Sequence, residues 1–440
     1  MTSRTKNATA LPPGPRWPDA VQAYLLMQRR PSIMRRLQKQ YGDVFTVRMP
    51  YGPSGSMVTV VALADPEHIR EVFAGPTDVF HAGEGNSSLL EVMGEHSLLL
   101  LDEQQHVRAK KLLMPAFTGR AMQGYRGLVT DLARSEIEQW QPGQEIVALE
   151  RMQAITLEII IQVVFGVTDA ARIDQLRPLV ARIANLNLIA LLAWKVPVLK
   201  RVQPWRGYAD AQRRLDELLY SEIANRRSDP HATERGDLLS RLLRPDDDGD
   251  TLTDAELRDQ LVTFLLAGHE TTATTLAWTL HELAHRPKLQ REAQAAVDRG
   301  DAEGDAFLEA IVKEAMRLRP VIFQATRTLT RPMEIAGYLL PAGVVVSPAL
   351  GLMGVHEAHH AAAYDFDPGR FLGQTPAANT WIPFGGGPRR CIGAAFSLME
   401  AVEILRQILT RFDPAPVHHD QDRLQPRGII NAPHRVPNCD

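Results

Sequence analysis

The feature that most constrains the fold is a long apolar segment between residues 254 and 286, which contains no proline. Thr253 and Glu256 have the spacing of a capping box, so a helix is expected to begin here. Pro287 marks its end. Because the segment is apolar around most of its circumference, it is expected to cross the protein interior and not to lie on a solvated surface.

Helical periodicity dominates the rest of the chain after about residue 100. Strand-like alternation is confined to two short regions. In one, Val44–Met49 is expected to pair with Met57–Ala62, and in the other, Met333–Leu340 with Gly343–Ser347. The pattern therefore predicts a mainly α protein with small β-sheets, an α+β fold in which the helices carry most of the mass.

The composition narrows the class of protein. The 440 residues carry a net charge of −3 without a basic tract, so no nucleic acid is expected as a partner. Cys391 and Cys439 are the two cysteines, which excludes a disulfide framework and fits a reducing compartment. The most apolar run, residues 183–199, is interrupted by polar residues and proline, so no membrane span is expected. These features favour a soluble cytoplasmic protein.

Residues 384–393 read FGGGPRRCIG and place Cys391 after three glycines and a proline. This composition disfavours both helix and strand, and it lets the backbone pass close to a flat group because no Cβ intervenes. The sequence after Gly393 predicts a helix, whose N-terminus should favour the thiolate form of Cys391. A buried structural cysteine is the alternative for a lone thiol, but here an ordered pattern, F-x-x-G-x-R-x-C-x-G, surrounds it.

This loop resembles the haem-binding signature of the cytochrome P450 family. The resemblance implies that Cys391 is the axial thiolate ligand to the iron of haem b, which lies between the long central helix and the cysteine loop. It also implies that Phe384 packs near the sulfur and that Arg389 pairs with a haem propionate. Residues 1–440 would form one domain, with a β-containing part at about 40–75 and 330–350 and a helical part at about 100–320 and 390–412.

Residues 313–320, KEAMRLRP, resemble a second family segment. Glu314 and Arg317 are three residues apart on one helical face and can pair. In the family this pair joins a downstream arginine and locks the cysteine loop, so Arg370 is expected as the third partner. These three residues should be structural. Gly369 stands where many relatives carry an acid, which suggests a thinner contact network here.

Residues 267–272, AGHETT, resemble the oxygen-binding segment of the family, midway along the long helix. Glycine inside a helix lowers its stability, and an acid and hydroxyls inside an apolar helix cost free energy unless they are hydrogen-bonded. The resemblance implies that Gly268 leaves room for dioxygen, that Thr271 hydrogen-bonds the oxygen, and that Glu270 feeds protons from solvent. Helical spacing places Gly268 and Thr271 on one face with Phe264 and Thr275, and this face should look onto the distal cavity.

Three more residues resemble the propionate partners of the family. His106 and Lys110 lie one helical turn apart and share a face. Many relatives have an arginine where Lys110 stands, and a lysine binds as a point charge rather than as a planar fork. Arg327 matches a further propionate arginine and follows Val321–Ala325, a stretch expected to line the pocket.

The resemblance implies a haem-thiolate monooxygenase that uses dioxygen and two electrons to hydroxylate an apolar small molecule, such as a fatty acid, terpene or steroid. The roof of its pocket is expected from residues 86–101 and 176–199. A separate ferredoxin and an NAD(P)H-dependent reductase should supply the electrons, because two cysteines cannot hold an iron–sulfur cluster. We expect a monomer. A basic docking patch for the ferredoxin, or merely solvated charge, is indicated by Arg108, Lys111, Arg120 and Arg126.

Two other functions compete with this interpretation. His281, Glu282 and His285 form a complete H-E-x-x-H motif, the signature of a zinc metalloprotease. Pro287 follows at once, and no third ligand stands in a recognisable pattern, so proteolysis is disfavoured. The other alternative is a haem-thiolate binding protein without turnover, against which the Glu270–Thr271 pair argues, since a carrier needs no proton delivery.

Overall fold

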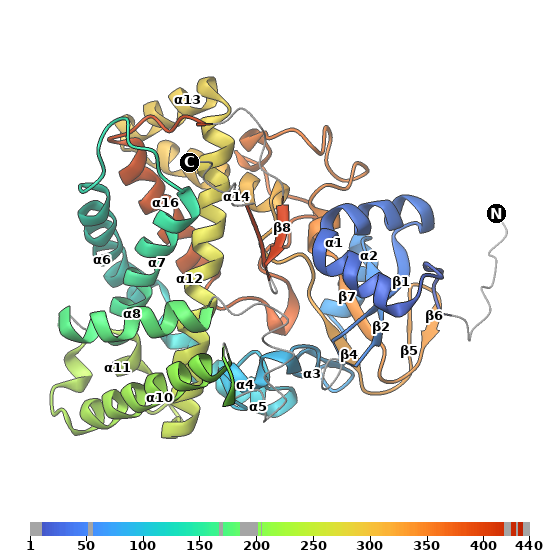
Figure 1. Cartoon of the computed structure of the whole chain (residues 1–440), viewed down its shortest axis with the longest axis horizontal. Coiled ribbons are helices and arrows are strands. Elements are labelled where there is room, and N and C mark those ends of the chain that lie inside the picture. The colour runs from blue at the N-terminus through green and yellow to red at the C-terminus, as the bar shows by residue number, and fades with distance from the viewer. Residues whose placement is uncertain are drawn as a thin grey trace.

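The computed structural model describes residues 11–51, 56–166, 170–184, 201–203, 205–417, 424–427 and 430–433. Helices gather around α12 (Asp254–Ala284), while the larger β-sheet lies at the other end of the molecule beside the N-terminal helix α1 (Asp19–Tyr41) (Figure 1). The prediction of a mainly α fold with small sheets is confirmed. Among the helices that the structure describes, none is long and apolar enough to span a membrane.

The predicted central helix begins and ends close to the expected residues. Thr253 accepts a hydrogen bond from the Glu256 backbone, and the Glu256 carboxylate accepts one from the Thr253 amide at 2.8 Å, which completes the capping box. His285 caps the other end, two residues before Pro287. Of its 31 residues, 22 are buried, and they lie on all sides of the helix.

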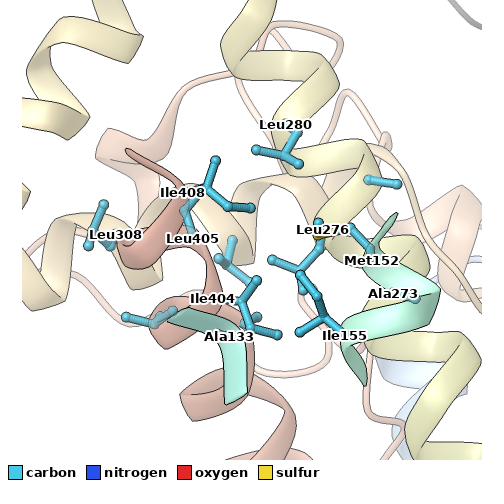
Figure 2. Close-up of a cluster of buried hydrophobic side chains, with 14 of the residues drawn as sticks. Ala133, Met152, Ile155, Ala273, Leu276, Leu280, Leu308, Ile404, Leu405 and Ile408 are labelled. Atoms are coloured by element: carbon cyan, nitrogen blue, oxygen red, sulfur yellow. The ribbon is translucent and has the colours of Figure 1, made fainter. Parts of the chain in front are cut away.

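The second half of α12 packs against α7 (Ala148–Phe165), α14 (Ala302–Leu318) and α16 (Ala394–Leu409), and α6 (Gly119–Ile137) packs on α7 and α16. Figure 2 shows their shared core, in which Leu276 and Leu280 of α12 face side chains from the neighbouring helices. This apolar packing is non-directional and strong in sum. It fixes the height of α12 relative to α16, the helix that follows Cys391. The facing side chains in Figure 2 are Ala133 of α6, Met152 and Ile155 of α7, Leu308 of α14, and Ile404, Leu405 and Ile408 of α16.

The larger sheet has five strands in the order β1-β2-β7-β4-β3. The early hairpin is confirmed, because β1 (Val44–Met49) pairs antiparallel with β2 (Val58–Leu63). The next strand, β7 (Val345–Pro348), runs parallel to β2, and β4 (Arg327–Leu329) and β3 (Phe80–His81) complete the sheet. The predicted β-containing part did not include residues 80–81.

The second predicted strand pairing was wrong. Residues 333–340 form a hairpin by themselves, in which β5 (Met333–Ile335) pairs with β6 (Tyr338–Leu340). The reason is the turn at Ala336 and Gly337, whose φ angles of 53° and 74° give the left-handed geometry of a two-residue hairpin. The segment after Pro341 is thereby released to join the larger sheet as β7.

The remaining elements connect these units. Short 3₁₀ turns occur at Met114–Phe117, Pro368–Phe371 and Gly387–Arg389, the last directly before Cys391. The other helices and strands are α2 (Pro66–Phe73), α3 (Ala82–Gly85), α4 (Leu90–Met93), α5 (Glu103–Leu113), α8 (Ala170–Ala184), α10 (Trp205–Ser228), α11 (Leu238–Leu242), α13 (Pro287–Arg299), α15 (Leu350–Met353), β8 (Leu424–Arg427) and β9 (Ile430–Pro433).

Candidate functional site

The burial of α12 is interrupted at one place. Ala267 is exposed and Thr271 is partly exposed, whereas residues 257–265 and 272–280 on either side are buried. Ala267 and Thr271 are four residues apart, so they lie on one face of the helix. A hollow therefore adjoins α12 at the predicted oxygen-binding segment. The Thr271 hydroxyl donates a hydrogen bond to the Ala267 carbonyl at 2.6 Å and lies at its edge.

The face that was expected to line the cavity is only partly open. Phe264 and Thr275 are both closed off, at 8% and 4% exposure. At Gly268, a Cβ would lie 3.0 Å from the Ile160 side chain of α7, so the missing side chain lets α7 approach α12. Gly268 is itself partly exposed beside Ala267, and its role in leaving room for dioxygen stays a prediction.

Glu270 is buried and faces α7, not the hollow. The side-chain amide of Gln153 lies 2.9 Å and 3.0 Å from its two carboxylate oxygens. Beside it, the Nδ1 atom of His269 lies 3.1 Å from the hydroxyl of Thr156, also on α7. The sequence analysis missed Gln153 and Thr156. The only signal for them in the sequence is their spacing, since two polar residues three apart share one face of the helix.

Two of the glycines before Cys391, Gly386 and Gly387, allow the loop to pack closely against Phe73. A Cβ on Gly387 would lie 1.9 Å from the Phe73 carbonyl oxygen, and one on Gly386 would lie 2.4 Å from the Phe73 ring. Gly387 also has a φ of 63°, which a side chain rarely adopts. The loop is thus pressed against the end of α2, a contact that sequence alone does not reveal.

Cys391 follows this contact, and its backbone amide donates to the Phe384 carbonyl at 3.0 Å. Its side chain is accessible. Desolvation by the surrounding protein nevertheless raises the pKa of the thiol. The Gly393 backbone and the charges of Arg390 and Lys110 lower that pKa, but by less. The predicted lowering by the helix N-terminus is therefore outweighed in the free thiol by desolvation.

His106, Lys110, Arg327 and Arg389 come together, as predicted, beside the cysteine loop. His106 and Arg327 are 4% and 7% exposed and line a small cavity with Arg389. Burial, followed by the charges of Arg389 and Lys110, lowers the pKa of His106 to about 4. Burial and then the charge of Arg389 lower the pKa of Arg327 to about 10. This concentration of positive charge fits an anionic group.

Arg389 and Lys110 also bind the protein around them. Arg389 forms an ion pair with Asp102 and donates to the carbonyls of Leu98, at 3.1 Å, and of Leu101. Lys110 donates to the carbonyl of Pro388 in the cysteine loop. Asp102 was not identified from the sequence. It also accepts hydrogen bonds from backbone amides at the start of α3, so it ties that segment to the cationic cluster.

The predicted structural residues assemble in full. Both oxygens of Glu314 bind Arg317, at 2.6 Å and 2.7 Å, and Arg370 lies 3.3 Å from Glu314. Arg317 also donates to the carbonyls of Gly354 and Ala363. The pair therefore joins α14 to the segment that precedes the cysteine loop.

The zinc-protease alternative is excluded by the surroundings of Glu282. This carboxylate is 1% exposed and forms ion pairs with Arg286 and with Arg319, the latter at 2.7 Å. A carboxylate held by two guanidinium groups is unsuited to act as a general base. In the part of the chain that the structure describes, no group of three His, Cys, Asp or Glu side chains could hold a metal ion.

The predicted basic docking patch is largely neutralised. Arg108 pairs with Asp250 at 2.7 Å, Lys111 with Asp246 at 2.8 Å, and Arg126 with Glu403. The side chain of Arg120 lies outside the described residues. The acidic loop before α12 thus occupies two of the cations that were expected to receive a partner. Of the expected pocket roof, residues 185–199 also lie outside the described residues.

Comparison with known proteins gives a consistent result. A family model described as Cytochrome P450 matches residues 12–436. The chain is 47% identical over 406 residues to "Putative cytochrome P450 135A1" of Mycobacterium tuberculosis (strain ATCC 25618 / H37Rv), covering 92% of this chain and 89% of the relative. It is 40% identical over 433 residues to "Putative cytochrome P450 135B1" of Mycobacterium bovis (strain ATCC BAA-935 / AF2122/97), covering 98% and 91%.

Two solved structures share the fold. The haem domain of cytochrome P450DA superimposes with a TM-score of 0.83 at 26% identity and covers 97% of this chain and 96% of its own. The retinoic acid-bound cyanobacterial CYP120A1 gives a TM-score of 0.81 at 22% identity, with 97% and 100% covered. The latter likeness concerns the fold alone.

Proposed function

The chain belongs to the cytochrome P450 family and is a haem-dependent monooxygenase, and from this premise we propose how its own residues carry the reaction. Cys391 would be the thiolate ligand of the haem iron, and the cysteine loop and the open face of α12 would hold the haem. The substrate is an apolar small molecule of the fatty acid, terpene or steroid type, which the enzyme hydroxylates.

The residues present fit the group that they would hold. The accessible thiol of Cys391 lies in the loop whose Pro388 and Arg389 line one cavity with the buried His106 and Arg327. This pairing of a thiol with adjacent cations is the observation that carries the proposal. The two carboxylates of haem b would need cationic or N–H donors, and Arg327 and Arg389 supply the positive charge, while the largely neutral His106 supplies an N–H donor. The raised pKa of the free thiol is consistent with this assignment, because a coordinating metal ion deprotonates a thiol outright.

The open face of α12 lies close to the residues that follow the cysteine loop. The hydroxyl of Thr272, next to Thr271, lies 3.2 Å from that of Ser397 in the second turn of α16. Ser397 also donates its amide to the carbonyl of Gly393, two residues after Cys391. One short chain of contacts therefore connects the segment carrying Thr271 with the segment carrying Cys391.

When bound, a thiolate-ligated haem supplies the activation of dioxygen with two electrons. Thr271 presents its hydroxyl at the hollow, where it can donate a hydrogen bond to dioxygen and receive a replacement proton from Glu270. Ala267 fixes the orientation of that hydroxyl through its carbonyl. Partly buried leucines at the hydrophobic core beside α12 keep water away and favour an apolar substrate: Leu98, Leu99, Leu100 and Leu266.

The electrons come from a separate ferredoxin and an NAD(P)H-dependent reductase, and the enzyme works as a cytoplasmic monomer. The two cysteines of the chain support a separate donor, since an iron–sulfur cluster needs more ligands. The neutralised cations of α5 mean that a ferredoxin has to compete with the acidic residues at 246–250 or bind elsewhere.

A spectral binding screen tests the substrate class. Purified ferric enzyme is titrated with fatty acids, terpenes and steroids of graded size, and compounds that shift the haem absorption band are incubated with a ferredoxin, a reductase and NADPH. The proposal expects saturable shifts with apolar compounds and products that gain one oxygen atom. Shifts confined to charged, water-soluble compounds would contradict it.

A further inference from the structure

One face of α7 contacts three consecutive residues of α12. Ile160 meets Gly268, Thr156 meets His269, and Gln153 meets Glu270. The three α7 residues are spaced at intervals of three and four, so they form one stripe along the helix. Along this stripe the side chains change from the apolar Ile160 to the hydroxyl of Thr156 and then to the amide of Gln153, which binds Glu270.

The stripe leads from the interior to the surface. Thr156 is fully buried, whereas Gln153 is partly exposed at the other end. The neighbouring α7 side chains Met152, Ile155 and Ile159 are buried and apolar. Burying polar groups among such neighbours costs free energy unless they are hydrogen-bonded. The Gln153 end of the stripe is therefore the end nearest to solvent, and Glu270 itself is 8% exposed.

The anchored carboxylate is turned away from Thr271. Successive residues of an α-helix are about 100° apart around its axis, so Glu270 lies on the α7 side while Thr271 faces the hollow. The Gln153 amide donates to both carboxylate oxygens, and the Nε2 atom of His269 lies 3.5 Å from one of them. Both contacts stabilise this outward position. To pass a proton to Thr271, the Glu270 side chain has to leave Gln153 and rotate inward.

We propose that Gln153 is a positioning residue that holds Glu270 at the water-accessible end of a proton-entry route and sets how readily it turns toward Thr271. The inference rests on the proposed roles of Glu270 and Thr271. In each delivery, Glu270 would receive one proton from bulk solvent through the water beside Gln153 and give it to the Thr271 hydroxyl oxygen. The Thr271 hydroxyl would in turn give up its own proton toward the hollow, and Glu270 would return to Gln153 as the carboxylate.

Three variants of the full-length haem enzyme test the proposal: Gln153→Leu, Glu270→Gln and the double variant. Gln162→Leu is the matched control, because Gln162 on the same helix donates to the Glu158 carboxylate at 2.8 Å. Gln153→Leu is expected to increase severalfold the share of electrons that ends in hydrogen peroxide, and to enlarge the solvent deuterium isotope effect on product formation. Gln162→Leu should change neither.

A double-mutant cycle separates positioning from a general effect on folding. In the Glu270→Gln background, Gln153→Leu should add no further peroxide, since a glutamine at position 270 cannot carry a proton wherever it is held. An equal increase in both backgrounds would overturn the proposal.

An infrared measurement gives a readout without turnover. The carboxylate band of Glu270, taken as the difference between wild type and Glu270→Gln, should shift in Gln153→Leu and stay in Gln162→Leu. An unshifted band would also overturn the proposal. If Glu270→Gln itself leaves coupling unchanged, the proposed role of Glu270 fails and the inference fails with it. If Glu270→Gln uncouples the enzyme and Gln153→Leu does not, only the inference fails.

Discussion

Arg317 lies 2.6 Å and 2.7 Å from the two carboxylate oxygens of Glu314, one turn earlier on α14, and neither side chain is exposed to solvent. A buried pair of charges compensates its desolvation only when its remaining donors and acceptors are satisfied. Here backbone carbonyls of residues 354, 363 and 365 take up the guanidinium. The Asp367 amide and Arg370 bind Glu314. The pair thus fixes the path of the chain that leads to the cysteine loop.

Replacing Arg317 by lysine is expected to lower the free energy of unfolding by about 3–5 kcal/mol, as for a broken buried ion pair. A lysine cannot reproduce the planar fork that reaches Glu314 and three carbonyls at once. Lys313→Gln is the control, because Lys313 pairs with Glu309 on the outer side of the same helix and should cost at most about 1 kcal/mol. Urea unfolding of the haem-loaded proteins measures both. Equal losses would contradict the structural role of the buried pair.

Gly387→Ala is expected to destabilise the cysteine loop and to speed the loss of haem. The new Cβ would collide with the Phe73 carbonyl and would also meet the strain of a positive φ. Gly373→Ala isolates the strain, because Gly373 has a φ of 64° with open space around it. It should cost about 1–2 kcal/mol and leave haem retention intact. Transfer of haem to apomyoglobin measures the rate of loss. The contact with Phe73 would be unimportant if both variants released haem at the same rate.

Thr271→Ala is expected to divert electrons from product to hydrogen peroxide, because it removes the hydroxyl at the hollow. Thr279→Ala is the matched control on the same helix. Its hydroxyl likewise bonds to the carbonyl four residues earlier, at 2.8 Å, but it is fully buried away from the hollow. Peroxide and product are measured per NADPH consumed. Unchanged coupling in Thr271→Ala, or equal uncoupling in both variants, would refute the role of Thr271.

Glu400 on α16 makes stability depend on pH. Complete burial raises the pKa of this carboxyl from its ordinary 4.5 to about 8. The folded state therefore keeps a proton that the unfolded state has lost, and stability falls as pH rises from about 4.5 to about 8. Glu400→Gln removes this loss, so its gain in unfolding free energy over wild type should be larger at pH 8 than at pH 5. A difference that does not vary with pH would show that Glu400 ionises normally.

The central helix could be predicted from sequence because its signals are local and agree with each other. Thr253 and Glu256 mark its start, and the apolar residues that follow on every side require burial. The same holds for α16 after Gly393. The pairing of Met333–Leu340 with Gly343–Ser347 was wrong because strand periodicity does not identify the partner. The turn at Ala336 and Gly337 decided it instead.

The candidate site likewise combines features that the sequence predicts with features that depend on long-range packing. His106, Arg327 and Arg389 could be chosen from the sequence by resemblance to a family pattern, and they do meet. The direction of Glu270 could not, since a helical wheel gives the angle of a side chain but not the helix that faces it. Long-range packing also explains why the glycines before Cys391 contact Phe73 and why burial raises the pKa of the thiol.

Coordination of the haem iron by Cys391 is the central claim, and the absorption spectrum of the reduced carbonyl complex tests it most directly. Wild-type enzyme reconstituted with haem should show the long-wavelength Soret band of a thiolate ligand, and Cys391→Ser should lose that band. Cys439→Ser, which changes the other cysteine, should keep it. A wild-type carbonyl spectrum without the thiolate band, or a Cys391→Ser variant that retains it, would contradict the account.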